Sequence, residues 1–422
     1  MAFVTLPTGD MTLTNVTVPG CLAGQERDVV RTQISVSNGQ IVAQPQPQAV
    51  NMGGAMVLPA FVDMHTHLDK GHISGRAPNP DGTFMGALTT VADDRTNHWS
   101  ATDVRSRMEF GLRCARAHGT RAIRTHLDSV PPQDEITWPV FRDLRAEWAG
   151  EIDLQGVSLI GCDTMDPEGR FRSTADMVAD AGGVLGMVAY PIPDLRARLV
   201  AFLAMAADRG LSVDFHVDET MDFDSECLRM IARTVIQTGF DARVVVGHLC
   251  SLSTQNEARA QSTLDLVAEA GLHVVSLPMC NLYLQDRHAG RTPRGRGITL
   301  VHEAKARGIP VSFASDNTRD PFYAYGDLDM LEVLSQATRI GHLDHADLDW
   351  VRAVSTTPAA TCGFDVPTLE PGAPADLVLF RARDWTELFA RPQSDRIVLR
   401  AGQAIDRTLP DYSELDHLME TA

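Results

Sequence analysis

The chain has 422 residues, which is long enough to bury a large core and to form one large domain plus a small one. It carries 55 acidic residues against 37 lysines and arginines, a formal net charge of −18. This balance argues against nucleic acid or an anionic membrane surface as a partner, because lysine and arginine are needed to neutralise phosphates. A small neutral or cationic ligand fits the composition better.

The sequence predicts no targeting or membrane segment. Residues 1–20 lack the basic start and the continuous apolar stretch of a secretory signal. No run approaches the roughly 20 apolar residues of a membrane span. The cysteines are scattered from Cys21 to Cys362 without a Cys-x-x-Cys pair, which is typical of reduced, buried thiols. We therefore expect a cytoplasmic protein.

The two ends of the chain have the pattern of β structure. Residues 11–54 and 366–407 contain short runs of β-branched residues separated by turn residues, including the hairpin-like stretch "SNGQ" at 37–40. Because both segments flank the middle of the chain, we expect them to pair into one small β-sandwich domain made of residues 1–55 and 366–422. Residues 56–365 would form the larger domain.

Between these ends, short apolar runs alternate with longer amphipathic stretches, as in repeated βα units on a parallel sheet. The candidate strands are residues 56–65, 120–128, 152–161, 183–190, 211–219, 242–250, 272–280 and 309–317. Helix-like stretches at 101–119, 195–210 and 225–239 each end in glycine, where a left-handed C-cap would fall. Eight βα units in about 260 residues match an α/β fold of the (β/α)8 TIM-barrel type. An open doubly wound sheet is the alternative, but no glycine-rich phosphate loop follows the first strand.

Histidine and acidic side chains cluster at the carboxyl ends of these strands, where a barrel builds its active site. In chain order they are His65, His67, His126, His216, Glu219, His248 and Asp316. Side chains two apart in a strand share a face, so His65 and His67 can point at one ion. Taken alone, this pair is explained equally well by two strand-end hydrogen bonds. Three imidazoles and one carboxylate, however, suit Zn²⁺ or Fe²⁺ with room left for a water.

Jointly these residues resemble the amidohydrolase superfamily and, within it, the cytosine deaminases. The matching stretches are "PAFVDMHTHLD", "RTHLD", "HVDE", the Gly-His pair at 247–248, "PMCNLYLQDR", "RGIT" and "SDNTRDPFYAYGDLDMLEVL". They span most of residues 56–340. The resemblance implies a metal-dependent hydrolase of C–N bonds that releases ammonia from a small cytosine-like heterocycle.

The resemblance also implies a ligand set and catalytic roles. The metal ligands would be His65, His67, His216 and Asp316. The fourth strand, "GMVAY", has no lysine, so the carbamylated-lysine bridge of binuclear relatives is missing and one divalent ion, Zn²⁺ or Fe²⁺, is expected. A bound ion lowers the pKa of its water toward neutrality. Asp316 would take a proton from that water, Glu219 would protonate the ring nitrogen next to the attacked carbon, and His248 would hold the developing hydroxyl.

The sequence departs from cytosine deaminases where the substrate is recognised. Gly161 stands in place of a glutamine after the third strand, Asn317 in place of the second of two aspartates, and Phe322 in place of a tryptophan. Gln285 matches a family position after the seventh strand, where it would contact the substrate or order a loop. The catalytic set is intact but the recognition set is altered, so we expect a modified pyrimidine or another ring to be preferred over cytosine.

Other polar residues near the strand ends have less specific expectations. His126 has no ligand counterpart in the family, so we expect a supporting or packing role. Asp69 and Asp128 follow histidines and would orient loops or imidazoles. Lys70 could contact a substrate carbonyl, but a solvated charge at the mouth of the barrel is the more frequent outcome for lysine.

Two further functions are compatible with the pattern. One is an amidohydrolase that acts on a triazine or on a creatinine-type cyclic amide. The other is a barrel that binds a heterocycle without turnover, which is disfavoured because a sensor would not need both Glu219 and a complete ligand set. The nucleobase deaminases with a Pro-Cys-x-x-Cys zinc signature are excluded, because no such motif occurs. Barrels with exposed helices often associate, so a homo-oligomer is among the expectations.

Overall fold

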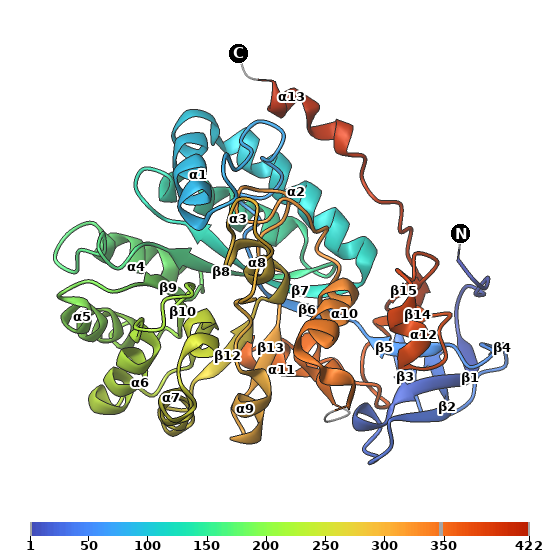
Figure 1. Ribbon diagram of the computed structural model, residues 1–422. Coiled ribbons are helices and arrows are strands. Elements are labelled where there is room, and N and C mark those ends of the chain that lie inside the picture. Colours follow the sequence, from blue (N-terminus) through green and yellow to red (C-terminus); the bar gives the residue numbers. More distant parts are fainter. Residues whose placement is uncertain (1, 346–348, 421–422) are drawn as a thin grey trace.

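The computed structural model describes residues 2–345 and 349–420. Figure 1 shows a group of parallel strands surrounded by helices, with a smaller sheet to one side. The strands of this smaller sheet are β1 (Met11–Pro19), β2 (Val29–Ser37), β3 (Gln40–Val42), β4 (Ala49–Asn51), β5 (Met56–Pro59), β14 (Leu377–Phe380), β15 (Ile397–Arg400) and β16 (Gln403–Ala404).

The smaller sheet joins the two ends of the chain. Its order is β16-β15-β14-β5-β1-β2-β3, with β4 beside β1, and β14 pairs antiparallel with β5. The predicted hairpin at 37–40 is present between β2 and β3, and Asn38 and Gly39 both have the positive φ that a tight hairpin turn requires. The two ends of the sheet lie close together, since a Cβ on Gly39, beside β3, would lie 3.2 Å from the Cβ of Ala401, beside β16. It encloses its own core, which includes Leu13, Val57 and Leu399.

The eight strands that the sequence predicts for the barrel are all present and parallel to their neighbours. They are β6 (Phe61–Thr66), β7 (Thr120–Asp128), β8 (Asp153–Leu159), β9 (Leu185–Ala189), β10 (Val213–Val217), β11 (Val244–His248), β12 (His273–Ser276) and β13 (Val311–Phe313). They form two arcs, β6-β7-β8 and β9 to β13. Isolated parallel bridges lie at both seams: Val157 with Val184 and Gly161 with Val188 at one, and Thr66 with Asp316 at the other. The fold is therefore TIM-barrel-like, with an added β domain.

Apart from β7, the observed strands are shorter than the predicted stretches, and at two places the chain also takes a different structure. The stretch 56–65 is divided at Ala60 into β5, which belongs to the smaller sheet, and β6, which belongs to the barrel. The stretch 272–280 ends as a strand at Ser276, because Pro278 occupies the first turn of a helix, where its missing N–H is tolerated. The division into domains 1–55 with 366–422 and 56–365 stays a prediction, and residues 1, 346–348, 421 and 422 of those ranges lie outside the described residues.

Helices cover the outside of the strands (Figure 1). They are α1 (Phe84–His98), α2 (Ala101–His118), α3 (Asp134–Glu147), α4 (Phe171–Asp180), α5 (Leu195–Ala207), α6 (Cys227–Thr238), α7 (Glu257–Glu269), α8 (Pro278–Leu284), α9 (Val301–Ala306), α10 (Met330–Gly341), α11 (Thr356–Cys362), α12 (Trp385–Ala390) and α13 (Asp416–Met419). Short 3-10 turns occur at Gly20–Leu22, Cys250–Thr254, Leu343–His345, Trp350–Val354 and Tyr412–Leu415. The predicted helices are α2, α5 and α6, and Gly119 and Gly239 cap α2 and α6 with positive φ.

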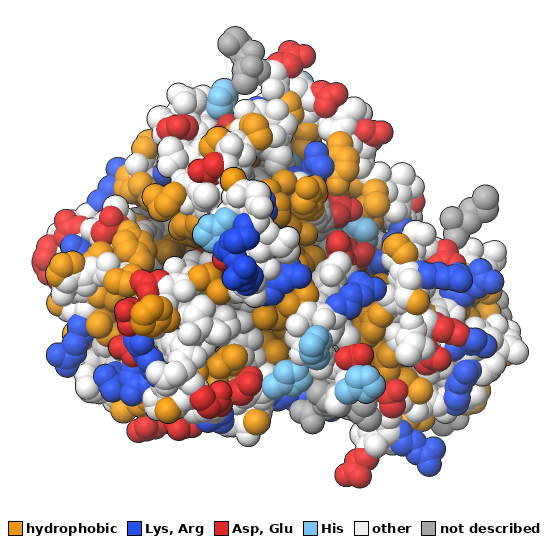
Figure 2. Space-filling model, in the orientation of Figure 1, with side chains coloured by type: hydrophobic (Ala, Val, Ile, Leu, Met, Phe, Trp, Pro, Cys, Tyr) orange, Lys and Arg blue, Asp and Glu red, His pale blue; other side chains and the backbone are white. Residues whose placement is uncertain are grey.

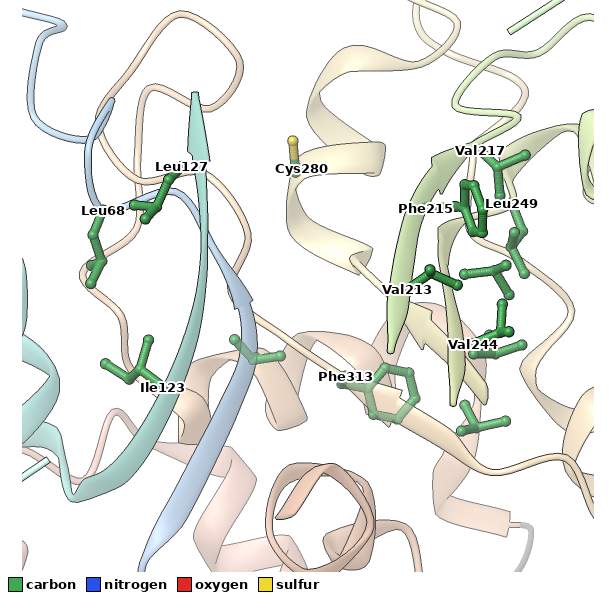
Figure 3. Close-up of a cluster of buried hydrophobic side chains, with 14 of the residues drawn as sticks. Leu68, Ile123, Leu127, Val213, Phe215, Val217, Val244, Leu249, Cys280 and Phe313 are labelled. Carbon is green, nitrogen blue, oxygen red and sulfur yellow. The ribbon is translucent and has the colours of Figure 1, made fainter. Parts of the chain in front are cut away.

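Side-chain alternation in β10 separates the hydrophobic core from the inside of the barrel. The labelled side chains of this strand in Figure 3 are Val213, Phe215 and Val217, all of them buried hydrophobic residues. The ring of Phe215 lies 5.3 Å from that of Phe202 in α5, so this face of β10 packs against the helices. Successive side chains of a strand point to opposite faces, and Asp214 and His216 therefore face the barrel interior.

Surface and thiol properties follow the composition. Acidic, basic and hydrophobic side chains are interspersed on the face shown in Figure 2. All seven cysteines are free thiols and six of them are buried, which confirms the expectation from their spacing. Among the residues that the structure describes, none of the helices has the length and apolar character needed to cross a bilayer.

Candidate active site

The four predicted metal ligands come together at the carboxyl ends of strands from both arcs. His65 lies in β6 and His67 directly after it, whereas His216 lies in β10 and Asp316 follows β13. All four are buried, with at most 5% of the residue surface exposed. The Asp316 backbone N–H donates to the His65 carbonyl at 2.9 Å, which ties the end of β13 to β6.

Four of the distances between the donor atoms are close to those between ligands of one ion. His65 Nε2 lies 3.1 Å from His216 Nε2, which lies 3.3 Å from His67 Nε2. The Asp316 Oδ1 atom lies 3.2 Å from His67 Nε2 and 3.6 Å from His65 Nε2. Ligand atoms about 2.1 Å from a tetrahedral zinc ion are separated by about 3.4 Å. The four side chains are therefore near enough to share one divalent ion.

The protonation of these groups also suits a cation. Burial, followed by the neighbouring histidines and Lys70, holds the pKa values of His65, His67 and His216 well below the usual range, so the imidazoles are neutral and can coordinate. Burial raises the pKa of Asp316 to about 7. Among the described residues, neither carboxylate oxygen of Asp316 has a hydrogen-bond donor. An orphaned buried carboxylate facing three neutral imidazoles is a fitting environment for a divalent ion.

Glu219 and His248 lie side by side next to this cluster. The Glu219 Oε1 atom is 3.3 Å from His248 Nδ1, and the side chain of Glu219 is 12% exposed. Burial, together with Asp316, raises the pKa of Glu219 well above its usual range. Burial lowers the pKa of His248 to about 3, so its imidazole is neutral. A protonated carboxyl group and a neutral imidazole are thus available at the mouth of the ligand cluster.

Asn281 belongs to this pair, although the sequence analysis did not single it out. Its side-chain amide lies 3.0 Å from His248 Nδ1 and 3.5 Å from Glu219 Oε1. Gln285, which was singled out, donates from Nε2 to the Glu219 carbonyl at 3.3 Å. The two lie four residues apart in the stretch that contains α8 and share a helix face, which is the signal that could have identified Asn281.

Positive φ angles are concentrated around the site. His248 and Asp316 have φ values of 73° and 64°, and Asp218, between His216 and Glu219, has φ 51°. Residues other than glycine rarely adopt this region, and such conformations cluster at functional sites. The backbone therefore turns sharply at the point where each of these strands delivers its polar side chain.

The predicted recognition residues lie in the loops after their strands. Asn317 donates to Asp320 Oδ2 at 2.6 Å, and the ring of Phe322, 8% exposed, lies 5.5 Å from the ring of Phe84. Gly161 follows β8, and a Cβ there would meet Asp163 Oδ1 at 2.7 Å and the Tyr190 hydroxyl at 2.9 Å. The space beside Gly161 is thus filled by the side chains of Asp163 and Tyr190, and the Tyr190 hydroxyl donates to Asp163.

Lys70 is buried rather than solvated, so that expectation was wrong. Only 5% of its surface is exposed, and its Nζ lies 3.0 Å from Asp128 Oδ1 and 5.5 Å from the centre of the Phe322 ring. Asp128 also accepts from Arg95, and its backbone N–H donates to Asp69 Oδ2. The carboxylates of Asp128 and Asp69 compensate the charge of the ammonium group, so Lys70 can be buried.

His126 lies beneath the ligand cluster and is completely buried. Its ring centre is 4.0 Å from that of His65 and 4.6 Å from that of His216. One of its nitrogens lies within 4.8 Å of the donor atoms of the three predicted histidine ligands.

Comparison with known proteins agrees with this geometry. The Amidohydrolase family model matches residues 174–405. The chain is 51% identical to a pterin deaminase from Rhizobium rhizogenes (strain K84), over 96% of this chain and 94% of that protein. It is 23% identical to an N-isopropylammelide isopropyl amidohydrolase from Pseudomonas sp. (strain ADP), over 79% and 81% of the two chains.

A solved structure shows the same fold. The crystal structure of 5-methylcytosine deaminase from Klebsiella pneumoniae with 5-fluorocytosine superposes with a TM-score of 0.80 at 24% identity, covering 95% of this chain and 98% of that one. The family match spans more than half of the chain, and the pterin deaminase match spans nearly all of it. The chain belongs to the amidohydrolase family and is a hydrolase of the deaminase type, which acts on C–N bonds.

Proposed function

We propose that the protein catalyses the metal-dependent hydrolytic deamination of a nitrogen heterocycle, with a fused, pterin-like ring as the first candidate substrate. The observation that carries this proposal is the convergence of three neutral imidazoles and a buried carboxylate beside the Glu219–His248 pair. The pterin ring is supported by the relative that is 51% identical over 96% of the chain.

In this proposal, the four side chains of the cluster hold one divalent ion, Zn²⁺ or Fe²⁺. The ion would supply the Lewis acidity that makes a water nucleophilic near neutral pH. Asp316 accepts a proton from the attacking water, since its Oδ1 and Oδ2 are free of hydrogen-bond donors among the described residues. Burial keeps the imidazoles of His65, His67 and His216 neutral, so these side chains do not take part in the proton transfers. The proton transfers are made by Asp316 and Glu219.

Glu219 and His248 act on the substrate ring. Asn281 donates to His248 Nδ1, which places the remaining imidazole proton on Nε2, where it can donate to the oxygen that forms on the attacked carbon. Glu219, held protonated by burial, gives its proton to the ring nitrogen beside that carbon. The proton taken up by Asp316 then passes to the amino group, and the hydroxyl on the attacked carbon gives its proton back to Glu219. The C–N bond breaks, ammonia leaves, and a ring carbonyl remains beside the protonated ring nitrogen.

A cytosine-like pyrimidine is the second candidate. It is favoured by the motifs shared with cytosine deaminases, from "HTHLD" to "SDNTRDPF". The replacement of the family's glutamine by Gly161, with Asp163 and Tyr190 filling its place, argues for a different ring edge. A carboxylate and a hydroxyl present one acceptor and one donor-acceptor group where cytosine deaminases present an amide.

Ammonia release across a substrate panel tests both candidates. The panel consists of pterins, cytosine, 5-substituted cytosines, a triazine and creatinine, each with protein reconstituted with Zn²⁺ or Fe²⁺. We expect a pterin to give the highest kcat/KM. Cytosine as the best substrate by tenfold or more would replace the first candidate with the second, and absence of ammonia from every ring would overturn the proposal.

Two properties of the whole protein stay predictions. We propose a cytoplasmic location and a homo-oligomeric state, the latter because exposed helices surround the barrel (Figure 1). Sedimentation analysis at several protein concentrations would test the second, and a monomer at all of them would contradict it.

A further inference from the structure

A charged layer lies inside the barrel, one step below the candidate metal site. Asp63 of β6, Arg124 of β7 and Asp214 of β10 each precede by two residues an inward-facing histidine of the same strand. Side chains two apart in a strand share a face, so these three belong to the next interior layer. At most 2% of each is exposed. In most barrels such layers are filled with branched apolar side chains.

Three of the buried side chains form a continuous polar chain. Arg124 Nη1 donates to Asp214 Oδ2 at 3.0 Å, and Arg124 Nε donates to Gln155 Oε1 at 2.8 Å. The other carboxylate oxygen of Asp214 lies 3.2 Å from His126 Nε2. The contacts thus run from Arg124 through Asp214 to His126, toward the carboxyl ends of the strands.

His126 transmits this arrangement to the candidate ligands. Its ring centre lies 4.0 Å from that of His65, with the two rings tilted by 39°, and it meets His216 edge-on at 4.6 Å and 89°. The Nε2 atom of His126 faces Asp214. The His126 ring therefore lies between Asp214 and the rings of His65 and His216. Rotation of His126 would remove the surface against which both rings are packed.

Stability alone does not explain such a group. Burying an arginine and a carboxylate has a desolvation cost that the ion pair only partly offsets, and apolar residues of similar volume are often as stable or more stable. A charged layer in this position therefore points to a requirement for orientation at the site above it. In known metal sites, hydrogen bonds to the second ring nitrogen orient the ligand histidines. Here the Nδ1 atoms of His65 and His216 have no hydrogen-bond partner among the described residues, and packing against the His126 ring takes that place.

We propose that Arg124, Asp214 and His126 form a positioning network that fixes the ring planes of His65 and His216 for metal binding. The Asp214 carboxylate lies 3.2 Å from His126 Nε2 and limits the rotation of that ring, a hydrogen bond from Arg124 holds Asp214, and His126 supports the two ligands. The inference rests on the proposed function, because it presupposes that the cluster binds a divalent ion. It assigns no catalytic role to the three residues, which act through the ligands.

The test uses the full-length protein with Co²⁺ as the probe ion. Asp214→Asn keeps the size of the side chain but removes its charge, and His126→Phe keeps a ring but removes its nitrogens. We expect both variants to bind Co²⁺ about 10- to 100-fold more weakly in chelator competition, the usual effect of losing a partner of a ligand. We also expect a changed visible absorption spectrum of the bound Co²⁺, and partial rescue in His126→Gln, whose amide can still donate to Asp214.

Ser276→Ala serves as the matched control, because Ser276 is a buried polar residue of the barrel whose hydroxyl has no hydrogen-bond partner among the described residues. Its Co²⁺ affinity and spectrum should equal those of the wild type. Variants that fold with unchanged affinity and spectrum would overturn the inference, as would failure of both variants to fold, which would assign the network to the stability of the barrel. A wild type that binds no Co²⁺ would instead overturn the proposed metal site.

Discussion

Burial changes the protonation states of single side chains at the site. Glu219 is the clearest case, because its carboxyl group is buried beside another carboxyl group and contacts a neutral imidazole. The side-chain amide of Asn281 donates to the Glu219 carboxyl group, and this contact is long at 3.5 Å. A group that retains its proton near neutral pH and lies beside the candidate ligands is suited to deliver that proton to a bound ring.

Replacement of Glu219 by glutamine should therefore abolish most turnover. The amide keeps the shape of the side chain but has no proton to transfer, so we expect kcat to fall by about 10²-fold or more while the divalent ion remains bound. Steady-state kinetics and elemental analysis of Glu219→Gln would check both expectations. Glu269→Gln, at an exposed position of α7, is the control. A near-normal kcat in Glu219→Gln would contradict the assigned role.

Gly161 offers a test of substrate preference. A glutamine there must displace the ends of the Asp163 and Tyr190 side chains, which a new Cβ would meet at 2.7 and 2.9 Å. Both are flexible tips, so the loop can accommodate the change. We expect Gly161→Gln to raise kcat/KM for cytosine relative to that for a pterin, because an amide restores a donor and an acceptor on that wall. Gly169→Gln, in the same loop, should leave the ratio unchanged, and an unchanged ratio in Gly161→Gln would show that this position does not select the ring.

His273 gives a pH-dependent contribution to stability at a distance from the site. Burial, followed by Arg243 and Arg124, lowers its pKa to about 4, and its Nδ1 lies 2.8 Å from the Thr361 hydroxyl. The unfolded chain binds a proton near pH 6.5 but the folded chain does so only near pH 4, so the stability present above pH 6.5 is lost as the pH falls through this window. We expect His273→Gln to lose less stability than the wild type between pH 7 and pH 5, by at most about 2 kcal/mol, because partial exposure screens the effect. Urea unfolding at the two pH values would measure the difference, and equal losses would contradict it.

At the scale of elements, the C-terminal segment 411–419 fastens distant parts of the barrel. In Figure 1 the chain leaves the smaller sheet and ends in α13, near α2. Leu415 and its neighbours pack against Phe110 and Cys114 of α2, and Arg76, from the loop after β6, donates to the Leu418 carbonyl at 3.0 Å. The Tyr412 hydroxyl donates to Asp327 at 3.1 Å, in the loop after β13. The segment therefore contacts the two loops that follow the strands of His65 and Asp316.

Removing the anchor of this segment should destabilise the protein. Leu415 is 6% exposed, and its replacement by alanine leaves a cavity against Phe110, so we expect a loss of ~2 to 4 kcal/mol. Leu409→Ala, at a position that is 43% exposed, should cost less than about 0.5 kcal/mol. Urea unfolding and limited proteolysis of the tail would compare the two variants. Equal stability of both would show that the segment is not anchored through Leu415.

At the scale of the whole molecule, the candidate site joins the two arcs of the barrel. His65 and His67 belong to the arc β6-β7-β8, whereas His216 and Asp316 belong to the arc β9 to β13. Among the described residues, isolated bridges connect the arcs at their seams, two between the β8 and β9 segments and one between Thr66 and Asp316. An ion shared by the four side chains would therefore be a crosslink between the arcs as well as a catalytic group.

Removal of the ion should lower stability and activity together. A ligand that binds only the folded state stabilises it by mass action, roughly 4 kcal/mol at a concentration 1,000 times the dissociation constant. We expect chelated protein to unfold at a lower temperature, to be inactive, and to recover both properties on reloading with about one ion per chain. Calorimetry and elemental analysis would check this. Two tightly held ions per chain, or activity that resists chelation, would contradict the single-ion site.

Local patterns in the sequence were sufficient to predict the elements and the ligand types. Alternating apolar runs predicted eight strands because each strand packs one face against helices, and Asn38 and Gly39 predicted the hairpin because few residues adopt positive φ. The residues at the strand ends, from His65 to Asp316, were predicted because parallel strands of a barrel deliver their carboxyl ends to one face.

The tertiary structure decided what surrounds those residues. Lys70 is buried because Asp128, 58 positions along the chain, supplies a carboxylate, and Asn281 joins the site because α8 brings it beside His248. Tyr190 of the next loop fills the space beside Gly161. His126 packs under His65, and Asp214 of another strand contacts the His126 ring. These contacts join residues that are far apart in sequence, and spacing along one strand or helix carries no signal of them. Side-chain periodicity thus determined the elements and the cluster of polar residues at the strand ends, whereas the folding of the strands into two arcs determined the partners of each polar group.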